Sequence, residues 1–299
     1  MLRAPSGGTA ALVQRGERAA DPVPSNRFEG TALRDYGAAE LDAALAHLGW
    51  RGGRLHEGVH QARKSLRRAR AVLALGMPAL GPGAKLLGRE FGRLNRRLSK
   101  LRDAQALVEV LDRLIGKTDE AEFASVLRRA RRIAASARAA RAREMLTDDP
   151  HLADRRALLT TLRAAFPALS WSTLTEEAVR KALARSEVRV EQARVRALVD
   201  GEDTDWHRWR RRVRRLSQQH RALGDMVAEL TAVKDDCKAI AVLLGDAQDY
   251  ALLRERTGKR SLFTEDDRRV LRLLADRGSE RIRARVEQKT QPLGATTAP

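Results

Sequence analysis

The sequence predicts an all-α protein, and three observations support this fold class. Long stretches are rich in Ala, Leu, Arg and Glu, which are strong helix formers. Apolar residues recur at spacings of three and four, the period of one helix face, and no stretch shows the alternation typical of a β-strand. Prolines are sparse and fall between the periodic stretches, at Pro78, Pro82, Pro150 and Pro167.

The apolar residues of the first strongly amphipathic helix recur later in the chain. This helix has a core stripe at Val59, Ala62, Leu66, Ala69 and Leu73. The first four positions recur 147 residues later (206 minus 59) as Trp206, Trp209, Val213 and Leu216. A constant offset over four core positions indicates an internal duplication.

The next helix repeats as well, at an offset of 146 (233 minus 87). Its core positions are Leu87, Phe91, Leu94, Leu98 and Leu101, and their counterparts are Val233, Cys237, Ile240, Leu244 and Ala247. We infer two homologous halves, at about 32–147 and 175–290, joined by a linker around 147–172. Each half is expected to form a four-helix bundle, because long amphipathic helices with short connections pack antiparallel. Residues 1–31 and 291–299 lack periodicity, and we predict disordered tails there.

Each copy of the first helix also carries a stripe of basic residues. The stripe starts with a His and continues with basic residues at +3, +4, +7 and +8, which lie on one side of a helix. Its members are His60, Arg63, Lys64, Arg67 and Arg68 in the first half, and His207, Arg210, Arg211, Arg214 and Arg215 in the second. Ordinary solvated faces mix charge signs, because like charges at i,i+4 repel, and these stripes contain no acidic residue. We therefore expect a polyanion site to which both helices contribute.

The composition favours recognition of phosphates over recognition of bases. The chain has 58 Lys and Arg against 39 Asp and Glu, a formal net charge of +19, so an anionic partner is expected. The guanidinium fork of Arg pairs with phosphate oxygens, whereas aromatic residues, which stack bases, make up only 4% of the chain. The single cysteine, Cys237, excludes an intrachain disulfide, and no apolar stretch approaches the roughly 18 residues of a membrane span. These features indicate a cytoplasmic protein.

The motifs resemble those of a known family. VHQARKSLRRAR at residues 59–70 is followed by LSKLRDAQ, and the second copy reads WHRWRRRVRRL followed by LLGDAQD. This pattern resembles the CHAD domain, the conserved-histidine α-helical domain, over nearly the whole chain apart from the tails, about 32–290. The resemblance implies two four-helix bundles related by a pseudo-twofold axis, with a central basic groove or pore that binds inorganic polyphosphate.

The resemblance also implies binding residues on the helix that follows each stripe. Lys234 and Lys238, one turn apart, match lysines of the family in the second half. The equivalent positions in the first half are Gly88 and Gly92, so we expect the charge there to come from other residues, namely Arg89, Arg93, Arg96, Arg97 and Lys100.

The leading hypothesis is non-catalytic binding of inorganic polyphosphate, with association with polyphosphate granules as its extension. The alternatives are a nucleic-acid-binding protein that contacts phosphates without reading sequence, and an enzyme or accessory factor of phosphate-polymer metabolism. Asp103 and Asp249 correspond at offset 146 and are expected to orient neighbouring arginines rather than to catalyse. We predict no catalytic residue, no metal and no cofactor.

Overall fold

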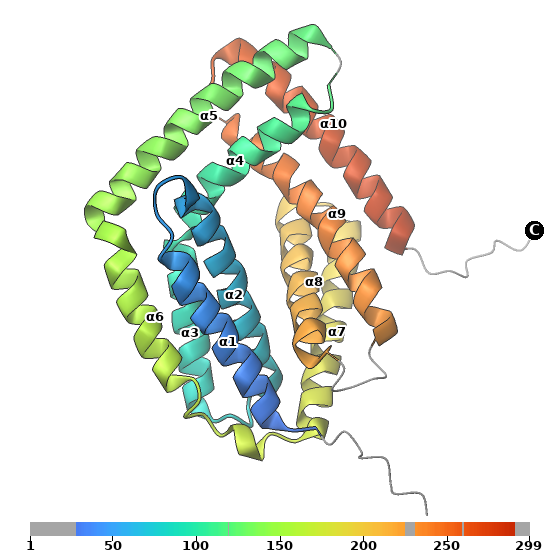
Figure 1. The fold of residues 1–299 in the computed structure, drawn as a ribbon. Helices are drawn as coiled ribbons and strands as arrows, with labels where there is room; N and C mark the ends of the chain where they lie inside the picture. The colour runs from blue at the N-terminus through green and yellow to red at the C-terminus, as the bar shows by residue number, and fades with distance from the viewer. Residues whose placement is uncertain (1–27, 119, 225–230, 259, 291–299) are drawn as a thin grey trace, which may run out of the picture.

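The computed structural model describes residues 28–118, 120–224, 231–258 and 260–290, and for 231–237 it describes only the course of the helix. The predicted all-α fold is confirmed, because every regular element in these ranges is helical (Figure 1). The first helix begins at Gly30, close to the predicted start. The predicted tails otherwise lie outside the described residues.

The helices of the described residues follow one another with short connections. In chain order they are α1 (Gly30–Leu48), α2 (Leu55–Gly76), α3 (Pro82–Arg97), α4 (Ser99–Ile115), α5 (Ala121–Asp148), α6 (Ala153–Ala165), α7 (Glu176–Asp200), α8 (Asp203–Leu223), α9 (Thr231–Arg256) and α10 (Glu265–Thr290). Short 3₁₀ segments lie at Gly52–Arg54, Pro150–Leu152 and Trp171–Thr173. The four prolines fall at helix boundaries, as predicted, and Pro82 is the first residue of α3, where its missing N–H costs nothing.

The predicted core stripes are buried wherever the structure describes their side chains. On α2 the five stripe residues are at most 1% exposed, and on α8 Trp206, Trp209, Val213 and Leu216 are at most 6% exposed. The stripe on α3 and α4 is equally buried, at most 7% exposed. On α9, Leu244 and Ala247 are buried and Ile240 is partly buried. The side chains of Val233 and Cys237 lie outside the described part of the chain.

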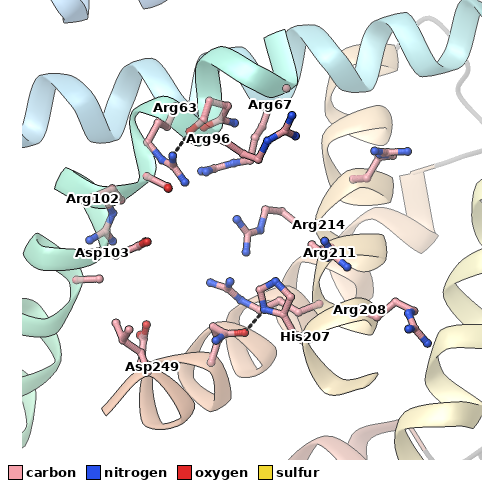
Figure 2. A pocket seen from close by; sticks show the side chains of 18 of the residues that line it. Arg63, Arg67, Arg96, Arg102, Asp103, His207, Arg208, Arg211, Arg214 and Asp249 are labelled. Carbon is pink, nitrogen blue, oxygen red and sulfur yellow. Dashed lines mark hydrogen bonds between the residues drawn. The ribbon is translucent and has the colours of Figure 1, made fainter. Parts of the chain in front are cut away.

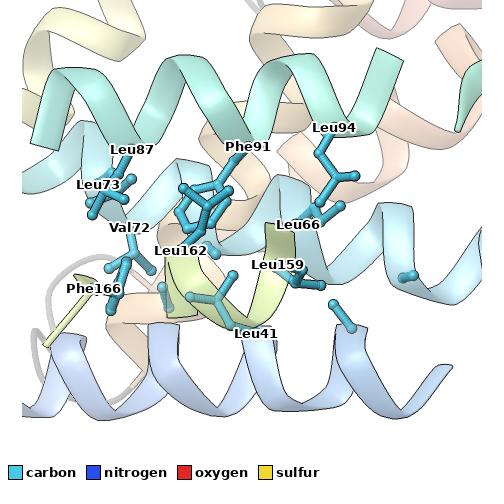
Figure 3. Packing of buried hydrophobic residues seen from close by; sticks show 14 of the residues in the cluster. Leu41, Leu66, Val72, Leu73, Leu87, Phe91, Leu94, Leu159, Leu162 and Phe166 are labelled. Atoms are coloured by element: carbon cyan, nitrogen blue, oxygen red, sulfur yellow. The ribbon is translucent and has the colours of Figure 1, made fainter. Parts of the chain in front are cut away.

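One hydrophobic core lies mainly among α1, α2, α3 and α6 (Figure 3), and it extends to the first part of α7 and the last part of α8. Three aromatic rings meet there. The ring centroid of Phe166 lies 6.4 Å from that of Phe91 and 4.9 Å from that of Trp171. The segment predicted as a linker therefore does more than connect the halves. It contains α6, whose apolar residues Leu159 and Leu162 recur at helical spacing and face this core.

A second core connects the halves of the chain, because it is formed by α4 and α5 with the end of α9 and the start of α10. A third core lies within the second half, among α7, α8, α9 and the end of α10. In Figure 1, α4 and α5 cross from the α1–α3 group towards α9 and α10. The expectation of a self-contained bundle in each half is not confirmed, because α4 and α5 share a core with elements of the second half. The pseudo-twofold relation stays a prediction.

A tight turn places α8 directly beside α7. Gly201 ends α7 with a φ of 70°, a left-handed conformation that glycine adopts without steric cost, and α8 begins two residues later. The α7–α8 pair thereby holds the second basic helix in place next to α2, with which α8 also packs. None of the described helices is long and apolar enough to cross a membrane.

Candidate anion-binding site

The two basic helices meet at a common cavity. It has a volume of about 770 Å³ and lies between α2, α3 and α4 on one side and α8 and α9 on the other (Figure 2). Among the described residues, eleven arginines and two histidines line it, against three carboxylates. So strong an excess of one charge in a hollow focuses a positive potential on whatever enters.

Equivalent arginines of the two stripes face each other across this cavity. Arg63 and Arg67 enter from α2, and Arg210 and Arg214 enter from α8. Figure 2 shows the side chains of Arg63 and Arg67 directed towards the side from which Arg214 projects. Each pair is separated by 147 residues in the sequence, so the structure brings together the two copies of the motif.

These arginines lack anionic partners. Within the described part of the chain, Arg67, Arg210 and Arg214 form no ion pair, and the buried Nε atoms of Arg67 and Arg210 have no hydrogen-bond partner. Burial and then the charge of Arg214 lower the pKa of Arg67 to about 8. Burial and then Arg214 likewise lower the pKa of Arg210 to about 9. A bound anion would relieve both effects, because it replaces lost hydration and cancels the repulsion.

Arg63 has a structural contact as well as a place in the cavity. Its Nη1 donates a hydrogen bond to the carbonyl oxygen of Asn95, in the last turn of α3, which satisfies a carbonyl that the helix leaves free. Burial lowers the pKa of Arg63 to about 10, although the nearby carboxylate of Asp103 acts in the opposite direction. Arg63 therefore holds the corner between α3 and α4 at the edge of the cavity.

The two motif histidines are neutral at neutral pH. Burial and then Arg102 lower the pKa of His60 to about 4. Burial also lowers the pKa of His207, whose Nδ1 is hydrogen-bonded to Oε1 of Gln248. With Nδ1–H donating to this oxygen, Nε2 carries the lone pair unless the ring is protonated. The histidines therefore contribute polarity to the cavity at pH 7, and the arginines contribute the charge.

Several predicted site residues lie elsewhere. Lys64 and Arg68 line neither this cavity nor its neighbour, because they lie on the flank of α2 that α1 covers, where Arg68 pairs with Glu40 at 2.9 Å. Arg97, Lys100 and Lys238 are exposed and line neither cavity. The side chain of Lys234 lies outside the described residues. The remaining predicted residues on α3 are Arg89 and Arg93, which line an adjoining cavity, and Arg96, which lines both.

The cavity also contains arginines that the sequence interpretation did not select, namely Arg70, Arg102, Arg208 and Arg212. The sequence positions of two of them, Arg70 and Arg102, could have indicated that they line the cavity. Arg70 follows Arg63 by seven residues, two helical turns, and so lies on the same face of α2. Arg102 lies one helical turn after Ser99 and beside Asp103, and all three line the cavity.

One carboxylate of the cavity, Asp249, is paired with a basic side chain. Asp249 on α9 accepts a hydrogen bond from Nη2 of Arg113 on α4 at 2.5 Å, and Arg113 also lies 3.5 Å from Asp246. This agrees with the expected orienting role of Asp249 and ties α4 to α9. Burial raises the pKa of Asp103, while Arg63 opposes that shift. Among the described residues, no group of three or more His, Cys, Asp or Glu is arranged to hold a metal.

The fold and the paired basic helices define an all-α protein with a cavity lined by arginines. The family model of the CHAD domain matches residues 35–258, three quarters of the chain, so the chain belongs to the CHAD-domain family. Among solved structures, PptA from Streptomyces chartreusis has a similar fold, with a TM-score of 0.60 and 18% sequence identity over 87% of this chain and 98% of that one. A comparison with curated protein sequences found no match.

Proposed function

We propose that this protein binds inorganic polyphosphate in the cavity between α2–α4 and α8–α9, without catalysing its hydrolysis. The observation that carries the proposal is the convergence of Arg63, Arg67, Arg210 and Arg214 on one cavity, where none of them is paired with a carboxylate of the described residues. Family membership supports the same ligand, because the CHAD motifs are the ones that supply these arginines. Recruitment of the protein to polyphosphate granules would follow from such binding.

The lining of the cavity favours a polymer of phosphates over nucleic acid. Proteins that grip single strands stack bases on aromatic rings, and no Phe, Tyr or Trp lines the cavity among the described residues. Several guanidinium groups at neighbouring positions match a chain of linked anions, since each phosphate engaged holds the next one nearby. Nucleic acid remains the alternative, with contacts to its phosphates only and weaker binding at physiological salt.

A titration with matched anions tests the proposal. Long-chain polyphosphate, duplex DNA and pyrophosphate are compared by calorimetry at the same salt concentration and at equal phosphate content. We expect polyphosphate to bind at least about ten-fold more tightly than DNA, because only polyphosphate presents continuous charge without bases. Equal affinity for the two polymers would contradict the proposal. Release of orthophosphate during incubation with divalent cations would contradict its non-catalytic part.

A matched pair of variants links the binding to the cavity. Arg67→Met with Arg214→Met removes two cavity charges. Arg128→Ala with Arg132→Ala removes two exposed charges from α5. Neither residue forms an ion pair within the described ranges, and neither lines a cavity named above. The first pair should weaken polyphosphate binding by about 100-fold, at roughly ten-fold per charge-assisted contact, and the second by less than about two-fold. Equal losses would mean that net charge alone attracts the polymer.

A further inference from the structure

A second, shallower cavity adjoins the anion-binding cavity. Its volume is about 370 Å³, and residues of α2 and α3 line most of it. The two cavities share Arg70, Gly92, Arg96 and Arg215. Because four residues line both, the two hollows form one continuous basic surface that runs from the space between the halves out along α2 and α3.

One face of α3 forms the basic wall of this second cavity. Lys85, Arg89, Arg93 and Arg96 line it at spacings of four, four and three residues, which place them on one side of the helix. At 1.5 Å per residue the row extends for roughly 16 Å. Arg93 pairs with Glu90, whereas Lys85, Arg89 and Arg96 form no ion pair among the described residues. Three unpaired cations spread along one side of a helix can contact several phosphates of an extended anion, but not one phosphate at the same time.

Two glycines of α3 leave space in the second cavity and at its junction with the first. A Cβ at Gly92 would lie 3.3 Å from the guanidinium carbon of Arg70, so the absence of a side chain lets Arg70 lie across α3 where the two cavities join. A Cβ at Gly88 would approach only Leu73, at 3.9 Å. The equivalent positions of the second half carry Lys234 and Lys238 in the sequence. The second cavity, which we call the trough, is therefore open and has cations along its wall. At the equivalent positions the sequence of the second half has two lysines instead of two glycines.

The three carboxylates of the anion-binding cavity are Asp103 on α4 and Asp249 and Glu255 on α9. Figure 2 shows Asp103 and Asp249 on the side away from Arg67 and Arg211, and the charge of Glu255 acts on Asp103. Asp249 is paired with Arg113, whereas Asp103 and Glu255 form no ion pair among the described residues. Unpaired carboxylates make this side less attractive to a phosphate chain than the α2–α3 side, where arginines predominate.

We propose that a polyphosphate chain leaves the anion-binding cavity through the trough between α2 and α3, and that this trough makes the protein select long chains over short ones. The inference rests on the proposed function, since it concerns the same ligand. Short chains fill the cavity alone, and longer chains gain the contacts of Lys85 and Arg89 in addition. These extra contacts are intramolecular once the first segment is bound, so they add affinity at little entropic cost.

The test compares tripolyphosphate with long-chain polyphosphate on the full chain. The variant Lys85→Ala with Arg89→Ala removes two exposed, unpaired cations that are one turn apart. Its control is Arg128→Ala with Arg132→Ala, which removes the same charge at the same spacing from α5. We expect the trough variant to raise the Kd for long chains about five- to ten-fold and the Kd for tripolyphosphate less than about two-fold. The control should change both alike, by less than about two-fold.

A second variant blocks the trough without removing a cation. Gly88→Glu has room for its Cβ, and Glu is a better helix former than Gly, so the protein should stay folded by circular dichroism. It should weaken long-chain binding selectively. Equal losses for both ligands, or no loss of length selectivity in either trough variant, would overturn the inference while leaving the proposed function intact. A wild-type protein that binds no polyphosphate at all would overturn the proposed function itself.

A third variant tests the direction of exit. Glu255→Gln removes one carboxylate from the side of the cavity where Asp103 lies. If chains leave between α2 and α3, this change should strengthen binding of short and long chains by the same factor. A gain confined to long chains would show that they leave past α9, contrary to the inference.

Discussion

At the scale of single residues, the burial and mutual repulsion of the cavity arginines lower the stability of the ligand-free protein. Burial lowers the pKa of Arg67 to about 8, and repulsion from Arg214, Arg63 and Arg210 adds to the shift. Nothing in the described structure compensates this charge with a carboxylate. A side chain that is held in an unfavourable setting is typical of binding sites, where stability is given up for affinity.

Arg67→Met should therefore separate stability from binding. Methionine fills much of the same space without charge, so we expect the free energy of unfolding of the ligand-free protein to rise by about 1 kcal/mol. The same change should weaken polyphosphate binding about ten-fold. Urea denaturation and calorimetric titration measure the two effects. A variant that is less stable than the wild type would show that Arg67 has a structural role.

His60→Gln provides the comparison at a neighbouring position. Because the pKa of His60 is held near 4, the ring carries no charge at pH 7, and its replacement should weaken binding less than Arg67→Met does. In the free protein the lowered pKa makes unfolding easier in acid. The unfolded chain takes up the proton near pH 6.5 and the folded one only near 4, so stability falls as the pH drops through this window. The free energy of unfolding of His60→Gln should therefore change less steeply with pH between about 6.5 and 4 than that of the wild type.

At the scale of helices, the neighbours of each basic helix decide how its stripe is used. The helix α2 packs against α1, α3 and α8, and α1 covers the flank that carries Lys64 and Arg68. At the equivalent places on α8, Arg211 and Arg215 line the cavity. Two copies of one motif thus present different faces, since a stripe at +3, +4, +7 and +8 is wider than the part of a helix that faces one cavity.

The N-terminus of α10 offers a second helix-scale prediction. Asp267 is 1% exposed, its N–H donates to Oγ1 of Thr264 at 3.3 Å, and its carboxylate accepts from Nε of Arg129 on α5 at 3.0 Å. Asp267→Asn should lower the free energy of unfolding by about 2 kcal/mol, because a charge-assisted contact between α5 and α10 is lost. The exposed neighbour Asp266 is the control, and Asp266→Asn should change stability by less than about 0.5 kcal/mol.

The same pair predicts a pH dependence. The hydrogen bonds from Arg129 hold the pKa of Asp267 below its ordinary value. A carboxyl group whose pKa is lowered in the folded state stabilises the protein above its ordinary pKa, and this stabilisation is lost as the pH falls through the lowered value. The stability difference between wild type and Asp267→Asn should therefore shrink in acid. A difference that is constant with pH would show that packing, not charge, holds Asp267.

At the scale of the whole molecule, the net charge of +19 and the cavity act together. Under the proposed function, the overall charge attracts polyanions to the protein, and the cavity retains one that fits between the two basic helices. Binding to the folded state alone raises the melting temperature by mass action.

Long-chain polyphosphate should accordingly raise the melting temperature at low salt, and the rise should diminish as salt is added. The affinity should fall linearly on a logarithmic plot against salt concentration, and Arg67→Met with Arg214→Met should make the slope shallower by about two, one for each lost contact. Differential scanning fluorimetry and titrations over a salt series measure both. A melting temperature that does not respond to polyphosphate would contradict binding to the folded protein.

The sequence by itself determined the fold class, and it predicted an internal duplication and an anionic ligand. Helix-forming composition, core stripes repeated at 147 and 146, and acid-free basic stripes are local properties that need no tertiary structure to be recognised. Only the tertiary structure decided which basic residues share a cavity. In the folded protein Arg70 and Arg102 line this cavity, whereas Lys64 and Arg68 do not. The halves are joined through α4 and α5, which share a core with α9 and α10. The physical reason is that helical periodicity fixes the angle between side chains, whereas the packing of neighbouring helices determines which of those angles face the cavity.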